Sequence, residues 1–161
     1  MSSDDLTKAI QGLENFFGKP SQKTLGAAVF QSDTAIGIEQ LDEFAKSKYK
    51  YFAGDAWESL GEENWTKTWE LVYRRADGVS GDILVELRDL KDAATALAAS
   101  QLTENHDDPK GAEGALKGVF DSPQVHCVSI YRIGDSEAIT GVLLAGILGS
   151  ERGVAVVYLM D

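Results

Sequence analysis

The chain has 161 residues, and its 26 aspartates and glutamates against 15 lysines and arginines give a net charge of −11. A field of this sign repels nucleic-acid phosphates and anionic lipids and attracts cationic surfaces, which disfavours general nucleic-acid binding. The length suits a single domain, residues 1–161, and the single cysteine excludes an internal disulfide and a thiolate metal cluster.

The N-terminal third predicts helices. Residues 2–17 place apolar side chains at three- and four-residue steps, and Gly18 and Pro20 follow them, so we expect an amphipathic helix that ends there. The apolar positions between residues 38 and 45 predict a second helix, and a short helix is expected over residues 56–60.

Residues 65–88 change from the helical period to a period of two. Large apolar residues stand at odd positions from 65 to 73, with polar residues between them, which is typical of a strand with one solvated face. The segment GDILVEL repeats this phase, and the intervening Asp77-Gly78 suits a turn. We therefore predict a β-hairpin over residues 65–88.

The C-terminal half returns to helices and then to strands. Leu90, Ala93, Ala94, Leu97, Ala98 and Leu102 form one predicted helical stripe, and residues 110–119 predict one more helix. Three β-rich runs follow, QVHCVSIYRI, AITGVLLAGIL and GVAVVYLM, separated by short glycine-bearing breaks that predict an antiparallel meander. The predicted fold is α+β, with a mainly antiparallel sheet of about five strands and helices packed on it.

The tail at residues 139–161 is the most apolar part of the chain. A bilayer span needs about 20 consecutive apolar residues, whereas polar residues split this tail into the runs 139–149 and 153–160. No membrane anchor is predicted. Runs that are apolar on both faces indicate central strands covered on both sides, or strands that meet a partner.

Catalytic and metal-binding patterns are not found. His126 and Cys127 are neighbours on a predicted strand and would point to opposite faces, so they cannot form a thiolate–imidazolium pair, and we expect Cys127 to be a small core residue. ENHDDPKG lacks the spacing of a calcium or zinc site, and no phosphate-binding glycine motif occurs. The sequence predicts no catalytic residue, no metal and no cofactor.

Five residues of the predicted hairpin are candidates for ligand binding. Trp65, Trp69 and Tyr73 would line a pocket, and Glu70 and Glu86 would be cross-strand neighbours on its solvated side. The alternative is that the rings fill the core and the carboxylates are exposed. The basic segment KSKYKYF, residues 46–52, interleaves lysine and tyrosine, but the net charge favours a solvated helix end or edge strand over nucleic-acid binding.

One segment carries a resemblance. SPQVHCVSIYRIGDSEAITGVLLAGI, residues 122–147, resembles the end of the nuclease A inhibitor-like family. The resemblance implies a small acidic α/β sandwich that blocks a non-specific, metal-dependent nuclease by inserting acidic and C-terminal residues into a basic cleft.

These patterns leave three hypotheses for function. The leading one is a non-enzymatic acidic binding protein, of inhibitor or immunity type, that engages a basic protein partner such as a nuclease. The alternative is a small-molecule-binding domain or small enzyme with a Trp/Tyr-lined pocket. A homo-oligomer formed through the C-terminal edge is also open. MSSDDLTKAI has no basic stretch followed by an apolar one, so a cytoplasmic location is expected.

Overall fold

The computed structural model describes residues 3–22, 25–76, 79, 81–135, 138–149 and 151–161. In chain order its elements are α1 (Ser3–Phe17), β1 (Gly26–Gln31), the 3-10 helix η1 (Ile38–Gln40), α2 (Leu41–Ala53), α3 (Asp55–Leu60), α4 (Glu62–Thr66), β2 (Glu70–Arg74), α5 (Ile83–Arg88), α6 (Ala93–Leu102), α7 (Pro109–Phe120), β3 (Val125–Gly134), β4 (Thr140–Leu148) and β5 (Arg152–Met160).

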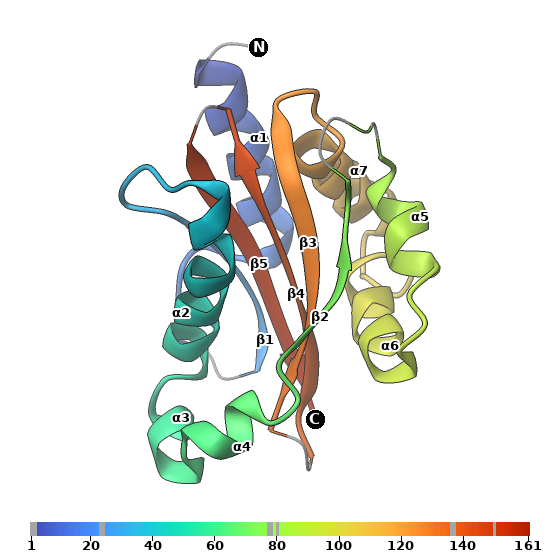
Figure 1. Ribbon diagram of the computed structural model, residues 1–161. Helices are drawn as coiled ribbons and strands as arrows, with labels where there is room; N and C mark the ends of the chain where they lie inside the picture. The colour runs from blue at the N-terminus through green and yellow to red at the C-terminus, as the bar shows by residue number, and fades with distance from the viewer. Residues whose placement is uncertain (1–2, 23–24, 77–78, 80, 136–137, 150) are drawn as a thin grey trace.

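The strands form one antiparallel sheet in the order β1-β5-β4-β3-β2, with helices on both faces (Figure 1). One face packs against α1, α5, α6 and α7, and the other against α2, α3 and α4. The predicted α+β class, with a mainly antiparallel sheet and packed helices, is confirmed. The predicted meander is also confirmed, because β3, β4 and β5 pair in chain order.

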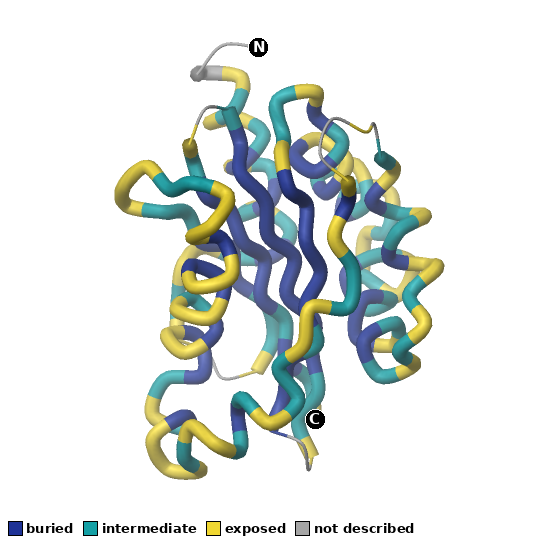
Figure 2. Tube along the Cα trace, in the orientation of Figure 1, coloured by how far each residue is buried: buried dark blue, intermediate teal, exposed yellow. Residues whose placement is uncertain are grey.

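The apolar tail forms the centre of this sheet. Figure 2 shows that β4 and β5 are buried along nearly their whole length. Successive residues of β4 enter different cores: Val142 and Leu144 lie on the side of α1 and α6, and Leu143 and Ala145 lie on the side of α2. Each buried valine or leucine contributes about 1.5–3 kcal/mol. The chain's own helices therefore cover the tail on both sides, and none of the described helices is long and apolar enough to cross a bilayer.

The helices expected from periodicity are largely found. Helix α1 ends as predicted, where Gly18 adopts a positive φ of 96° and its N–H donates to Glu14 O at 2.8 Å. The predicted stripe of α6 is wrong in part, because its buried face includes Thr95 and Ala99 whereas Leu97 is 53% exposed. Alanine-rich segments define a face poorly because many alanines fit either side of the helix.

The predicted hairpin over residues 65–88 is wrong. Trp65 belongs to helix α4, and the strand β2 pairs with β3 rather than with residues 83–88. Residues 83–88 form α5, which Asp82 caps by accepting hydrogen bonds from the N–H groups of the first turn. Ile83 and Leu87 lie four apart, a spacing that fits both a helix face and a strand face. The Asp77-Gly78 turn lies outside the described residues.

The fifth strand comes from elsewhere in the chain. Strand β1 forms in the short apolar run after α1 and pairs with β5 from Gly26 to Gln31. Cys127 is 8% exposed and packs in the core beneath α2, so its prediction as a core residue is confirmed. It adopts a positive φ of 54° where the β3–β4 register shifts between His126 and Ser129.

Candidate functional site

A groove of about 680 Å³ runs between β2 and the segment that joins α5 to α6. Its wall combines apolar and acidic side chains, with one lysine among them. The lining residues are Glu70, Leu71, Val72, Tyr73, Val85, Glu86, Asp89, Leu90, Lys91 and Asp92. We refer to these residues as the β2 groove.

Strand β2 lies at the edge of the sheet, so one side of its backbone faces away from β3. No strand of the described residues pairs with that side. The opposite edge strand, β1, differs: Ala28, Val29 and Phe30 are buried, and Val29 N–H donates to Gly18 O at 3.0 Å. On β2, Leu71 is 39% exposed. The accessible edge of the sheet is therefore the one beside the groove.

A β-bulge shapes the floor of the groove. The register with β3 pairs Leu71 with Tyr131 but Tyr73 with Ile130, so Val72 is the extra residue. Val72 and Tyr73 both pack against the core beneath α5, α6 and α7. Bulges increase local twist and re-aim side chains, and this one turns Tyr73 towards α5.

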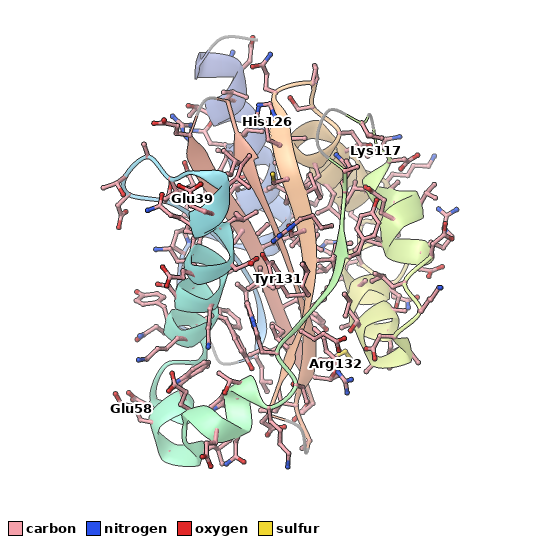
Figure 3. All side chains as sticks on the ribbon, viewed as in Figure 1. Glu39, Glu58, Lys117, His126, Tyr131 and Arg132 are labelled. Carbon is pink, nitrogen blue, oxygen red and sulfur yellow. The ribbon has the colours of Figure 1, made fainter. Side chains whose placement is uncertain are left out.

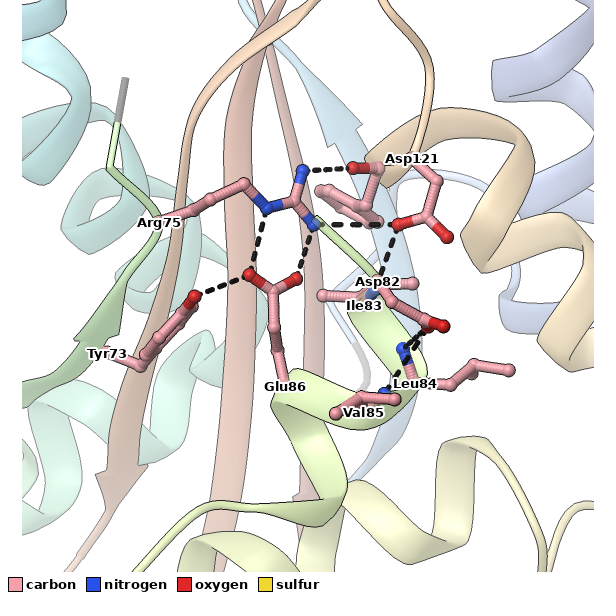
Figure 4. Close-up of polar contacts among 9 residues, drawn as sticks. Tyr73, Arg75, Asp82, Ile83, Leu84, Val85, Glu86 and Asp121 are labelled. Atoms are coloured by element: carbon pink, nitrogen blue, oxygen red, sulfur yellow. Dashed lines mark hydrogen bonds and ion pairs between the residues drawn. The ribbon is translucent and has the colours of Figure 1, made fainter. Parts of the chain in front are cut away.

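A buried ion pair holds the far wall (Figure 4). Arg75, 6% exposed, donates to both carboxylate oxygens of Glu86, with Nε at 2.9 Å from Oε2 and Nη2 bonded to Oε1. Its Nη1 donates to Phe120 O at 2.6 Å, and Asp121 lies 3.5 Å from Nη2. Tyr73 donates to Glu86 Oε2 at 2.6 Å. This cluster joins β2, α5 and the end of α7.

The cluster holds β2, α5 and the end of α7 together. Burial, followed by the hydrogen bond to Glu86, raises the pKa of Tyr73 to about 12, so its hydroxyl stays a donor at neutral pH. Burial also raises the pKa of Asp121, although Ile83 N–H donates to its carboxylate at 2.8 Å. Both Glu86 oxygens are occupied, so Glu86 fixes the wall and is not poised to take a proton from a ligand.

Asp92 closes the other end of the groove as the N-cap of α6. It accepts hydrogen bonds from Thr95 N–H at 2.9 Å and from Thr95 Oγ1 at 2.6 Å. Arg132, which leaves β3 towards α6 (Figure 3), places Nη1 at 3.3 Å from Asp92 Oδ1. The pKa of Asp92 is lowered, first by the Thr95 hydroxyl and then by the Thr95 amide and Arg132.

Replacing Asp92 with alanine is expected to lower the free energy of unfolding by about 1 kcal/mol at pH 7, because α6 loses its cap. The folded-state pKa of Asp92 lies below the unfolded value of 3.8, so its stabilisation is present above that value and disappears as the pH falls through the folded pKa. Urea denaturation at pH 7 and below pH 3.8 measures this. An Asp92→Ala deficit that persists undiminished in acid would contradict the capping role.

The structure separates the five predicted site residues. Tyr73, Glu70 and Glu86 line the β2 groove. Trp65 and Trp69 belong to an aromatic cluster on the other face of the sheet. Glu70 and Glu86 are not cross-strand neighbours, because Glu70 pairs with Arg132 and Glu86 lies on a helix.

The aromatic cluster is a filled core. Trp65 stacks on Trp57 with ring centroids 6.2 Å apart, and Trp69 stacks between Tyr49 and Tyr131 at 5.9 and 4.8 Å. Trp65 Nε1 donates to Ala56 O at 2.9 Å. Tyr49 Oη hydrogen-bonds to the backbone of Gly134 at 2.9 and 3.0 Å. The residues that line the β2 groove include Tyr73 and no tryptophan.

Sequence reasoning missed Leu71 on β2 and the groove residues after α5. Leu71 lies on a short strand, and nothing in the local sequence marks it as a binding residue. The sequence pattern assigns Leu90 to a helical stripe, although α6 begins only at Ala93. Asp92 does carry a local signal, because aspartate before an apolar helical run is typical of an N-cap. That signal marks a helix start and not a groove.

A second cavity, of about 730 Å³, opens where the start of α1 approaches the β4–β5 turn. Its wall is mostly polar and contains none of the five predicted site residues. Among the residues that the structure describes, no group of three or more histidine, cysteine, aspartate or glutamate side chains is arranged to hold a metal ion. The basic segment 46–52 lies on α2, where Tyr49 is buried, so its tyrosines and lysines do not form one alternating surface.

Comparisons with family models, with curated proteins and with solved structures found no match to this chain. The function proposed for it therefore rests on the geometry and charge of the β2 groove.

Proposed function

We propose that this protein is a non-enzymatic binding protein whose β2 groove engages a basic segment of a partner protein. The observation that carries this proposal is the composition of the groove, which has four carboxylates, one lysine and exposed apolar side chains beside an open strand edge. The net charge of −11 adds a long-range field of the same sign. Such complementarity accelerates encounter with a basic partner and makes binding salt-sensitive.

The carboxylates of the groove divide into two kinds. Glu86 and Asp92 are held by Arg75 and Arg132, so they shape the wall. Glu70 and Asp89 are exposed and have no ion pair among the described residues. These two carboxylates are the ones available to a lysine or arginine of a partner.

A nuclease with a basic cleft would have this chemistry, and the resemblance of residues 122–147 to the nuclease A inhibitor-like family is the reason to test one. Those residues form β3 and most of β4, which are largely buried. An inhibitory contact would therefore be made by the groove and not by the resembling segment. A cytoplasmic location stays a prediction.

Reversing the two exposed carboxylates, in Glu70→Lys/Asp89→Lys, is expected to weaken binding of a basic probe at least about tenfold, because each exposed ion pair contributes about 0.2–1 kcal/mol and each reversal adds repulsion. The probe is a fluorescein-labelled peptide of alternating lysine and valine, measured by anisotropy at about 50 mM and about 300 mM salt. Binding to the unmodified protein is expected to weaken with salt.

The matched control is Glu58→Lys/Glu63→Lys, which makes the same change in net charge on exposed residues of α3 and α4 that do not line the groove; Figure 3 labels Glu58. It is expected to bind the probe nearly as well as the unmodified protein. Equal weakening by the two double variants would show a general charge effect, and no binding by the unmodified protein would remove the proposal.

The size of the groove also favours a second candidate. Small-molecule sites have volumes of about 300–1,000 Å³, and the β2 groove, at about 680 Å³, lies in this range. Tyr73 and the exposed Val85 and Leu71 would then contact the ligand. A small-molecule library is screened for compounds that raise the unfolding temperature. A compound that raises it for the unmodified protein but not for Leu71→Lys would favour this alternative.

A further inference from the structure

This inference rests on the proposed function and concerns how the partner is held. We propose that the basic segment binds in an extended conformation and adds as a strand to the outer edge of β2. The segment carries lysine or arginine alternating with apolar residues, and belongs to another protein. Its backbone pairs with β2 while its side chains meet the β2 groove.

The outer edge of β2 carries little protection. Natural sheets protect edge strands with lysine, proline, bulges or a covering element. Strand β2 has one of these devices, the bulge at Val72, but its sequence, ELVYR, contains neither lysine nor proline, and Glu70 and Leu71 are exposed. The other edge strand, β1, is buried over its three middle residues. An edge left accessible beside a groove is suited to pair with an incoming strand.

Arg74, the cation of β2, points away from the β2 groove. Its Nη2 lies 2.5 Å from Asp42 Oδ1 on α2, and its Nε donates to Ser129 Oγ at 2.9 Å. Tyr131 also donates to Asp42, so the guanidinium is tied to a network across β3 towards α2. Arg74 therefore does not neutralise the carboxylates of the β2 groove, where Glu70 and Asp89 outnumber the one lysine, Lys91.

Exposed apolar and acidic residues occur together along the β2 groove. Leu71 and Val85 are 39% and 42% exposed, and the carboxylates of Glu70 and Asp89 lie beside them. Side chains of an extended strand point alternately to its two faces. A segment that alternates apolar and basic residues can direct its basic residues to the face of Glu70 and its apolar residues to the opposite face, where Leu71 pairs with Tyr131 on the side of α2.

Ion pairs already hold the wall of the β2 groove in place. The Arg75–Glu86 pair ties α5 to β2, and Asp92 ties the start of α6 to Arg132 on β3. Binding then requires little ordering of the receptor, which reduces the entropic cost of association. Most of the entropic cost of binding then comes from ordering the incoming segment, as in other cases of strand addition.

A second copy of this chain is a poorer occupant of the edge. Pairing β2 with its equivalent would bring two sets of groove carboxylates together, and each copy carries a net charge of −11. Repulsion of this kind disfavours self-association through the edge.

The test compares three peptides on the unmodified full chain. The parent alternates lysine and valine; in one derivative every lysine amide is N-methylated, and in the other every valine amide. Alternate amides of a strand point to opposite edges, so each derivative loses the hydrogen-bond donors of one edge only. One derivative is expected to bind at least about tenfold more weakly than the other. Amide hydrogen exchange at β2 is expected to slow when the parent binds.

The variant Leu71→Lys is expected to weaken parent binding at least about tenfold, because an edge lysine blocks strand pairing. Its control is Leu97→Lys, which changes an exposed leucine of α6 outside the groove. Sedimentation velocity of the protein alone measures self-association.

The outcomes separate the two proposals. If the parent binds and Glu70→Lys/Asp89→Lys weakens it, but the two methylated peptides bind alike, strand addition is wrong and the proposed binding of a basic segment in the acidic β2 groove stands. If the parent does not bind, both proposals fail. A dimer that Leu71→Lys converts to monomers would show that a second copy occupies the edge and would overturn the inference.

Discussion

Replacing Arg75 with methionine is expected to lower the free energy of unfolding by about 3–5 kcal/mol, because the change leaves buried carboxylates without their cation. The side chains of Glu86 and Asp121 are 9% and 17% exposed. Phe120 O and Tyr73 also belong to this cluster. Methionine keeps most of the volume of arginine, so the loss measures charge and hydrogen bonds more than packing. Urea denaturation followed by circular dichroism gives the value.

Two further variants serve as controls for the loss of stability in Arg75→Met. Arg74→Met removes the neighbouring, more exposed ion pair with Asp42 and is expected to cost only about 0–1 kcal/mol. Arg75→Met/Glu86→Leu removes both charges of the buried pair and is expected to regain part of the stability lost in Arg75→Met. A loss below about 1 kcal/mol in Arg75→Met would contradict a structural role for the cluster.

Replacing Trp65 with alanine is expected to cost about 3–5 kcal/mol, because it opens a cavity in the core beneath α2, α3 and α4. Trp65 is 0% exposed and stacks on Trp57. Its carbonyl accepts a hydrogen bond from the Tyr49 hydroxyl at 2.8 Å. Chemical denaturation measures the loss, and the fluorescence of Trp57 and Trp69 reports on the remaining cluster.

The control for Trp65→Ala is Trp65→Phe, which keeps an aromatic ring. It is expected to lower the free energy of unfolding by less than the alanine variant does. Both variants, where folded, are expected to bind the lysine–valine peptide as the unmodified protein does, since Trp65 lies on the face of the sheet opposite the groove. Loss of peptide binding in a folded Trp65→Phe protein would show that the tryptophan contributes to the site.

Residues 65–88 show where sequence reasoning fails. An apolar residue at every second position also places apolar residues four apart, so Trp65 and Trp69, or Ile83 and Leu87, fit a helix as well as a strand. Asp82 resolves the ambiguity for α5 because it caps the helix. Only residues 70–74 become a strand, and they do so by pairing with β3, which follows them by about fifty residues in the chain.

The candidate site was partly predictable. Tyr73, Glu70 and Glu86 are groove residues, although the hairpin that suggested them does not exist. Glu86 reaches the groove because α5 packs near β2 and Arg75 binds its carboxylate. Asp89 comes with the segment that follows α5. Contacts between elements distant in sequence are not encoded in any local period.

The sequence by itself determined the α+β class, the end of α1, the C-terminal meander and the sign of the charge. These follow from local signals, such as a glycine after an apolar stripe or a polar break between β-rich runs. The tertiary structure decided that β1 completes the sheet, that Trp65 and Trp69 fill a core, and that β2 forms the accessible edge beside the acidic groove. Strand order and edge exposure depend on long-range pairing, whose free energy comes from burying both faces of the sheet at once.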